Sequence, residues 1–149
     1  MLRLLLLIAG LAVGIAAEPG VQIEVAGGTL PGIPAKAHGR LHLTDQEGLV
    51  FRFKEAELWI DSTKVNTLEY GQNVSRRYAA AILISPMLLL SKSRRHFVTL
   101  GFVDTDGRQQ ALVFRVQKGD IRAVLASLEA RTGRRVEYQD NEARKSGKG

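Results

Sequence analysis

Five basic side chains share one acid-free segment of the sequence, and they are the residues best suited to bind something anionic. No Asp or Glu occurs between Glu69 and Asp104. The bases in this interval are Arg76, Arg77, Lys92, Arg94 and Arg95. A base held close to an anionic membrane contributes about 1 kcal/mol to binding, so five together matter where one does not. The clustering predicts a site for an anionic lipid surface or for an envelope partner protein.

The same segment holds an uncharged stretch between its basic pairs. Residues 78–90 carry no charge and few polar atoms. One interpretation is that they form two short buried elements, with the arginines solvated at the ends. The alternative is an apolar hairpin or short helix lying in a membrane interface, because the stretch is too short to span a hydrocarbon core of roughly 30 Å.

Two motifs resemble metal sites but lack the necessary ligands. His38 and His42 are four residues apart, and the alternation around them predicts a strand. Four strand residues span about 13 Å, so the two imidazoles cannot share one ion. Residues 104–107 begin like a calcium loop, but their glycine comes too early and Arg115 occupies the place of the bidentate Glu. We expect ordinary surface histidines and a hairpin turn, with no metal and no cofactor.

No catalytic signature is present in the sequence. It has no cysteine and no Gly-x-Ser-x-Gly elbow, and its glycine-rich loop after residue 26 is not followed by Gly-Lys-Ser/Thr. Glu55, Glu57 and Tyr70 are the scattered polar residues from which a small hydrolase or isomerase could build a site. That envelope enzyme is the alternative hypothesis. The leading hypothesis is a non-enzymatic binding or scaffold module that uses residues 76–95.

The first residues have the pattern of a secretory signal. Arg3 gives a positive start, residues 4–17 are uncharged, and small residues end the run. We predict a signal peptide over residues 1–17, removed on export to the periplasm or the extracellular space. The alternative, an uncleaved anchor, fits less well because the run is shorter than the bilayer core. Without cysteine, the exported domain has no disulfide and no lipid-modified N-terminal cysteine, so its core must stabilise it.

Alternating apolar and polar residues predict a mainly β domain. Strands are expected over residues 21–25, 39–43, 49–53, 58–60, 64–70, 96–103 and 110–117, with a short extended piece at 136–138. Turn residues at 44–48 and 104–108 join two hairpins, the second through Asp106-Gly107. Trp59 is expected in the core rather than at a membrane interface.

One amphipathic helix follows the strands. Apolar residues at the i, i+3, i+4 and i+7 positions predict a helix over Ile121–Thr132. The Asp120 side chain is expected to cap its start and Gly133 to end it in the left-handed region. Residues 18–138 should therefore form a single domain, and residues 139–149 a flexible polar tail with nothing to bury.

This order of strands and then a helix predicts an α+β fold, a small antiparallel barrel or bent sheet closed by the C-terminal helix. The segments LEYGQNVSRR, LLSKSRRHFVTLGF, LEARTGRRVEYQD and NEARKSGKG resemble a family of uncharacterised exported bacterial proteins, and the element order is similar to pleckstrin-homology-like domains. The resemblance implies a binding or scaffold role but no particular ligand. The first hairpin of this sequence carries four bases, Lys36, Arg40, Arg52 and Lys54. Their pattern does not match the inositol phosphate site of the eukaryotic relatives.

Nucleic acid is not an expected partner. The formal net charge of +6 would favour it. However, the bases are not interleaved with the aromatic residues that single-stranded nucleic acids stack on, and the predicted export removes the protein from them.

Overall fold

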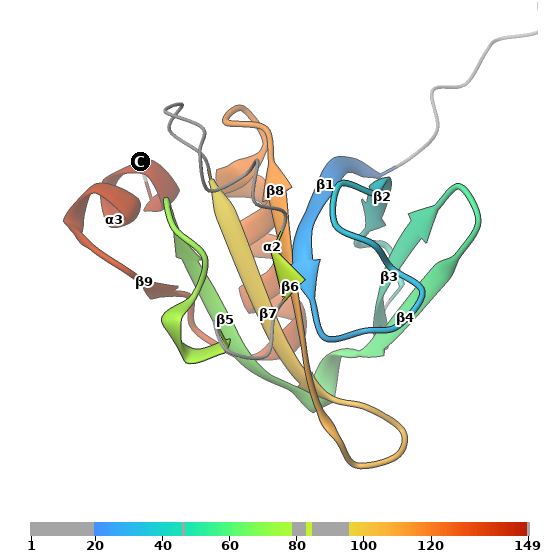
Figure 1. The fold of residues 1–149 in the computed structure, drawn as a ribbon. Coiled ribbons are helices and arrows are strands. Elements are labelled where there is room, and N and C mark those ends of the chain that lie inside the picture. Colours follow the sequence, from blue (N-terminus) through green and yellow to red (C-terminus); the bar gives the residue numbers. More distant parts are fainter. Residues whose placement is uncertain (1–19, 46, 79–82, 85–95, 149) are drawn as a thin grey trace, which may run out of the picture.

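The computed structural model describes residues 20–45, 47–78, 83–84 and 96–148 (Figure 1). The elements are β1 (Val21–Gly28), β2 (His38–His42), β3 (Gly48–Phe53), β4 (Glu57–Asp61), η1 (Ser62–Lys64), β5 (Val65–Gly71), η2 (Arg76–Tyr78), β6 (Leu83–Ile84), β7 (Phe97–Val103), β8 (Gln109–Val116), α2 (Ile121–Thr132), β9 (Glu137–Tyr138) and α3 (Asn141–Lys148). The predicted signal peptide, residues 1–17, lies outside the described residues.

The strands form one sheet in the order β4-β3-β2-β1-β8-β7-β5-β9, with β6 paired to β1. All neighbours are antiparallel except β5 and β9. The predicted mainly β, α+β class is therefore confirmed. Strands β4 and β9 end the order, so the sheet is open. Figure 1 shows β2, β3 and β4 on one side of the molecule and β9 and α3 on the other.

Both predicted hairpins are present. In the first, Leu41 of β2 is paired with Phe51 of β3. In the second, the Asp104 carboxylate accepts hydrogen bonds from the backbone N–H groups of Asp106 and Arg108, and Gly107 has a φ of 76°. Hydrogen bonding, first from the Gln110 side chain, lowers the pKa of Asp104. The interpretation of residues 104–107 as a turn is thus confirmed.

Helix α2 buries the stripe that its sequence predicts. Ile121, Val124, Leu125 and Leu128 are all buried, in one cluster with inward side chains of β1, β2, β3, β5, β7 and β8. We call the sheet face that carries this cluster the inner face. Gly133 ends the helix with a φ of 68° as predicted.

Asp120 stands at the start of helix α2 as predicted, but the prediction that its side chain caps the helix is wrong. Its side chain makes no capping hydrogen bond. Its backbone carbonyl accepts the Val124 N–H at 3.0 Å instead. The backbone of Asp120 is helical, with φ −99° and ψ −14°, whereas a capping side chain usually comes from a residue in the extended region.

On the outer face, the chain after β5 folds back over β5, β7 and β8. Ser75 Oγ donates to Glu69 Oε2 at 2.7 Å, and the hydroxyls of Tyr78 and Thr67 are 2.9 Å apart. Val74 and Tyr78 pack on a second cluster of buried residues, which comprises Ala26, Phe97, Ala111 and Val113. Gly101 permits this approach, because a Cβ there would collide with the Tyr78 hydroxyl.

The end of the chain differs from the predicted flexible tail, because residues 141–148 form helix α3. Ala143 is fully buried, so the expectation that the tail has nothing to bury is wrong. The Ala143 N–H is bonded to Asp140 Oδ1 at 2.7 Å, and Gly147 lies against the Tyr138 ring. A side-chain cap and a close glycine contact thus position a helix with very little apolar surface.

Trp59 was predicted to lie in the core, but 49% of its surface is exposed. Its neighbours Leu58 and Ile60 alternate toward the core, so the residue between them must face outward on an end strand of the sheet.

Candidate anion-binding site

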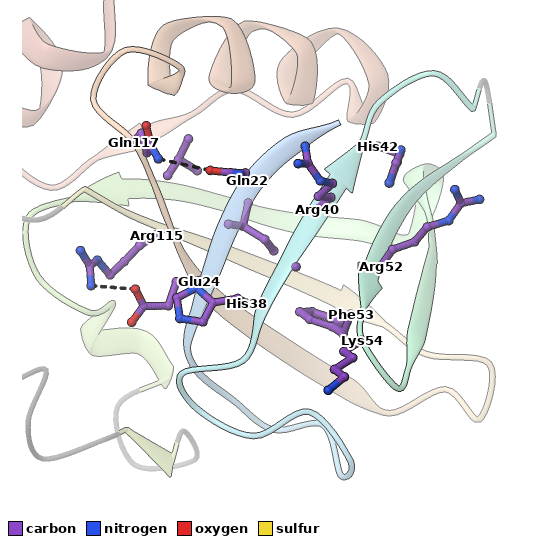
Figure 2. A pocket seen from close by; sticks show the side chains of 13 residues that line it. Gln22, Glu24, His38, Arg40, His42, Arg52, Phe53, Lys54, Arg115 and Gln117 are labelled. Atoms are coloured by element: carbon purple, nitrogen blue, oxygen red, sulfur yellow. Dashed lines mark hydrogen bonds and ion pairs between the residues drawn. The ribbon is translucent and has the colours of Figure 1, made fainter. Parts of the chain in front are cut away.

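Among the described residues, the outer face of the sheet borders an open hollow over β1, β2 and β3, and strand alternation places basic side chains there. On β2, Leu41 is completely buried in the main cluster. His38, Arg40 and His42 must therefore point to the other face, because successive side chains alternate. Figure 2 shows Arg40 and His42 on this strand and Arg52 on its neighbour.

The register brings two arginines directly opposite each other. Arg40 of β2 is paired with Arg52 of β3, and on its other side with Gln22 of β1. Like charges at opposed positions destabilise a sheet. Arg52 is paired in turn with Glu57 of β4, and its Nε lies 2.9 Å from Glu57 Oε2. Both side chains of this ion pair are more than half exposed, so it contributes little stability.

Further hydrogen-bond donors lie at the edge of the site. Arg40 Nη1 donates to the Gly20 carbonyl at 3.2 Å. The side-chain amide of Gln117 donates to Gln22 Oε1 at 3.4 Å (Figure 2). These amide and guanidinium groups can all donate hydrogen bonds to an oxyanion.

A second row of polar residues lies beside the arginines. Glu24 of β1 is opposite His38 on one side and Arg115 of β8 on the other. Arg115 Nη1 forms an ion pair with Glu24 Oε2 at 3.1 Å (Figure 2). These side chains are 30% and 24% exposed, so their geometry is better held than that of the Arg52–Glu57 pair.

Together these residues surround an open hollow of about 870 Å³. Its lining comprises Gln22, Ile23, Glu24, His38, Gly39, Arg40, His42, Arg52, Phe53, Lys54, Arg115, Val116 and Gln117. Four of these residues are Lys or Arg and one is Glu, so positive charge exceeds negative charge even when Glu57 is added. A concave surface with an excess of guanidinium groups is suited to carboxylate, phosphate or sulfate.

The predicted basic segment is described only in part. Arg77 forms an ion pair with Glu137, with Nη2 3.1 Å from Oε2, and Arg76 begins η2. Three predicted site residues lie outside the described residues: Lys92, Arg94 and Arg95. Of the uncharged stretch, Tyr78 packs on the outer face and Leu83–Ile84 pairs with β1, while residues 79–82 and 85–90 also lie outside the described part. A role for these five bases stays a prediction.

The residues of the alternative enzyme hypothesis lie on separate parts of the sheet. Glu55 is exposed in the turn between β3 and β4, and Glu57 pairs with Arg52. Tyr70 is buried on β5, where its hydroxyl contacts His96 Nδ1. Burial raises the pKa of Tyr70 to about 12 and lowers that of His96. Within the described ranges, no hydrogen bond joins Tyr70 to either glutamate, so the structure does not bring these residues together.

His38 and His42 lie on strand β2, as their surroundings predicted. His38 is exposed as expected, but His42 is buried, so the expectation of a surface histidine is wrong there. Residues 20–45, 47–78, 83–84 and 96–148 contain no group of three His, Cys, Asp or Glu placed to hold a metal ion. Within the same part of the chain, no helix has the length and apolar character needed to cross a membrane.

The sequence interpretation missed the hollow although its elements were predicted. The sequence does carry a sign of the hollow, since basic residues fall at outward positions on both strands of the first predicted hairpin. The hollow forms only through the register of β2 and β3, which pairs Arg40 with Arg52 although they are twelve positions apart in the chain. Comparison of the sequence with protein-family models and with curated proteins finds no match.

Proposed function

We propose that this protein is a non-enzymatic binding module that takes anionic groups in the hollow over β1, β2 and β3. The observation that carries the proposal is the placement of Arg40 directly opposite Arg52. In the unbound sheet the Arg52 guanidinium pairs with Glu57 of β4, and Arg40 donates to the Gly20 carbonyl next to β1. An anion bound between the two side chains would accept charge-assisted hydrogen bonds from both guanidinium groups when they turn toward it.

The setting of this module is part of the proposal. We propose that the chain is exported to the envelope, where an anionic membrane surface or an acidic partner supplies the anion. The strand order followed by α2 supports a pleckstrin-homology-like architecture. The basic segment with Arg76, Arg77, Lys92, Arg94 and Arg95 would add a second positive surface.

Calorimetric titration of the purified protein with tripolyphosphate tests the proposal. We expect saturable binding at about 0.01 M ionic strength that weakens at least several-fold at about 0.15 M, because the Debye length falls from about 30 Å to about 8 Å and the side chains of the hollow are largely exposed. A titration without heat of binding at either ionic strength would contradict the proposed function.

A further inference from the structure

Strand β4 is one end of the sheet order, and its hydrogen bonds with β3 determine which of its backbone groups point away from the sheet (Figure 1). The Phe53 N–H donates to the Ala56 carbonyl at 2.8 Å just before the strand. The Ser62 N–H donates to the Glu47 carbonyl at 3.1 Å just after it. The register between these two hydrogen-bonded pairs is unbroken. Because hydrogen-bonded and non-hydrogen-bonded pairs alternate in an antiparallel ladder, every second residue of β4 directs its backbone groups away from β3.

The residues with outward-directed backbone groups are Glu57, Trp59 and Asp61. The N–H and C=O groups of Glu57 and Trp59 and the N–H of Asp61 thus lie along the edge, before the chain enters η1. Within the described part of the chain, no strand pairs with this side of β4. The strand also lacks features that often block an edge, because it contains no proline, no lysine and no bulge. Such an edge can accept an additional strand.

The side chains of β4 form two rows, which indicate what an added strand should carry. The inner row is apolar, since Ile60 is buried and the partly buried Leu58 packs against the main cluster. Apolar residues of an added strand would extend that cluster, and β-branched ones suit a half-buried sheet surface. The outer row consists of Glu57, Trp59 and Asp61, so an exposed aromatic residue stands between two acids.

The acids of the outer row favour a basic occupant over a second copy of the chain. Two copies paired antiparallel about Trp59 would place Glu57 opposite Asp61 twice, and opposed like charges are destabilising. Residues 45–61 contain five acids and two bases, although the whole chain has a net charge of +6. Glu57 bonds to Arg52 and Asp61 caps η1, but an ionised carboxylate has about four acceptor sites, so both can accept a further donor.

We propose that β4 binds an extended segment of a partner protein as an additional antiparallel strand, with basic residues opposite Glu57 and Asp61 and apolar residues beside Leu58 and Ile60. This edge is separate from the hollow, because β4 contributes no residue to the lining. The inference therefore goes beyond the proposed function and does not depend on anion binding.

The test is titration of the protein with the peptide acetyl-Thr-Lys-Val-Thr-Val-Lys-Thr-amide. Paired with β4, its lysines lie opposite the two acids, its central threonine lies opposite Trp59, and its valines extend the inner row. Because Trp59 is the only tryptophan in the sequence, its emission reports on this edge. We expect a saturable change in emission, and at least about tenfold weaker binding of the analogue with Glu in place of both lysines.

Methylation of single peptide amides separates strand pairing from attraction between charges. A methyl group on the central Thr nitrogen removes the donor to the Trp59 carbonyl and should weaken binding at least about tenfold. A methyl group on a Val nitrogen, which would point away from β4, should weaken it less than about threefold. Equal effects of the two methylations would overturn strand addition. Equal affinity for the basic and acidic peptides, or no binding of the basic peptide, would overturn it as well.

Matched protein variants test the position of the peptide. Glu57→Lys should weaken binding of the basic peptide about fivefold, because it opposes like charges. Asp106→Lys makes the same change in net charge in the exposed turn between β7 and β8 and should change binding less than about twofold. Equal weakening by both variants would contradict binding at β4. In sedimentation of the protein alone, a dimer that Trp59→Lys abolishes would place a second copy on this edge and overturn the inference. None of these results bears on tripolyphosphate binding in the hollow.

Discussion

Replacement of Leu125 by Ala should lower the free energy of unfolding by about 2–5 kcal/mol, the range for removing a buried leucine side chain and leaving a cavity. Leu125 is 2% exposed and belongs to the cluster in which α2 packs on the inner face of the sheet. Its Cδ1 also lies close to Gly147, so the change should loosen α3 as well. Urea denaturation of the wild type and the variant measures the difference.

The control for this prediction is on the opposite side of the same helix. Ala126 is exposed, and Ala126→Ser should change the free energy of unfolding by less than about 0.5 kcal/mol. A loss under about 0.5 kcal/mol for Leu125→Ala would mean that α2 does not pack as described. The sheet would then lack the support that holds its inner face, and the hollow on its outer face would have no fixed shape.

The second large effect is expected in the hollow itself. The double variant Arg40→Gln/Arg52→Gln should bind tripolyphosphate about a hundredfold more weakly than the wild type, because a hydrogen bond to a charged group contributes about 1.5–3 kcal/mol and two are removed. The fold should be retained, because both side chains lie on the outer face and the exposed Arg52–Glu57 ion pair that is lost contributes little stability. Calorimetry gives the affinity, and urea denaturation gives the stability.

Two matched variants accompany this measurement. Arg108→Gln/Arg135→Gln makes the same change in net charge at exposed positions outside the hollow, so a change caused by net charge alone would appear in both double variants. Arg94→Gln/Arg95→Gln tests the predicted basic segment. If this last variant loses binding while Arg40→Gln/Arg52→Gln keeps it, the anion site belongs to residues 76–95 and not to the hollow.

Local sequence patterns were sufficient to predict the two hairpins and helix α2. Alternation determines which face of a strand is apolar, and Asp106-Gly107 provides the positive φ that its turn requires. The spacing of Ile121, Val124, Leu125 and Leu128 gives a helix whose apolar side chains all lie on one side. These signals depend only on neighbours in the chain.

The remaining features depend on contacts between distant residues. Trp59 was expected in the core because it is aromatic, yet Glu57 and Asp61 share its face and could have indicated that this face is outward. Helix α3 has one fully buried apolar residue, Ala143, and depends on contacts with Tyr138 that no periodicity predicts. The hollow was missed for the same kind of reason, since its arginines come together only through strand pairing.

The most direct test of the anion site is to observe where an anion binds. In amide-resolved NMR of the ¹⁵N-labelled protein, added tripolyphosphate should shift the signals of β2 and β3 most strongly, above all those of Arg40 and Arg52, with smaller shifts around Gln22 and Gln117. Residues of β5, which lie outside the lining of the hollow, should change little. Shifts concentrated in residues 76–95, with none in the β2–β3 hairpin, would contradict the account.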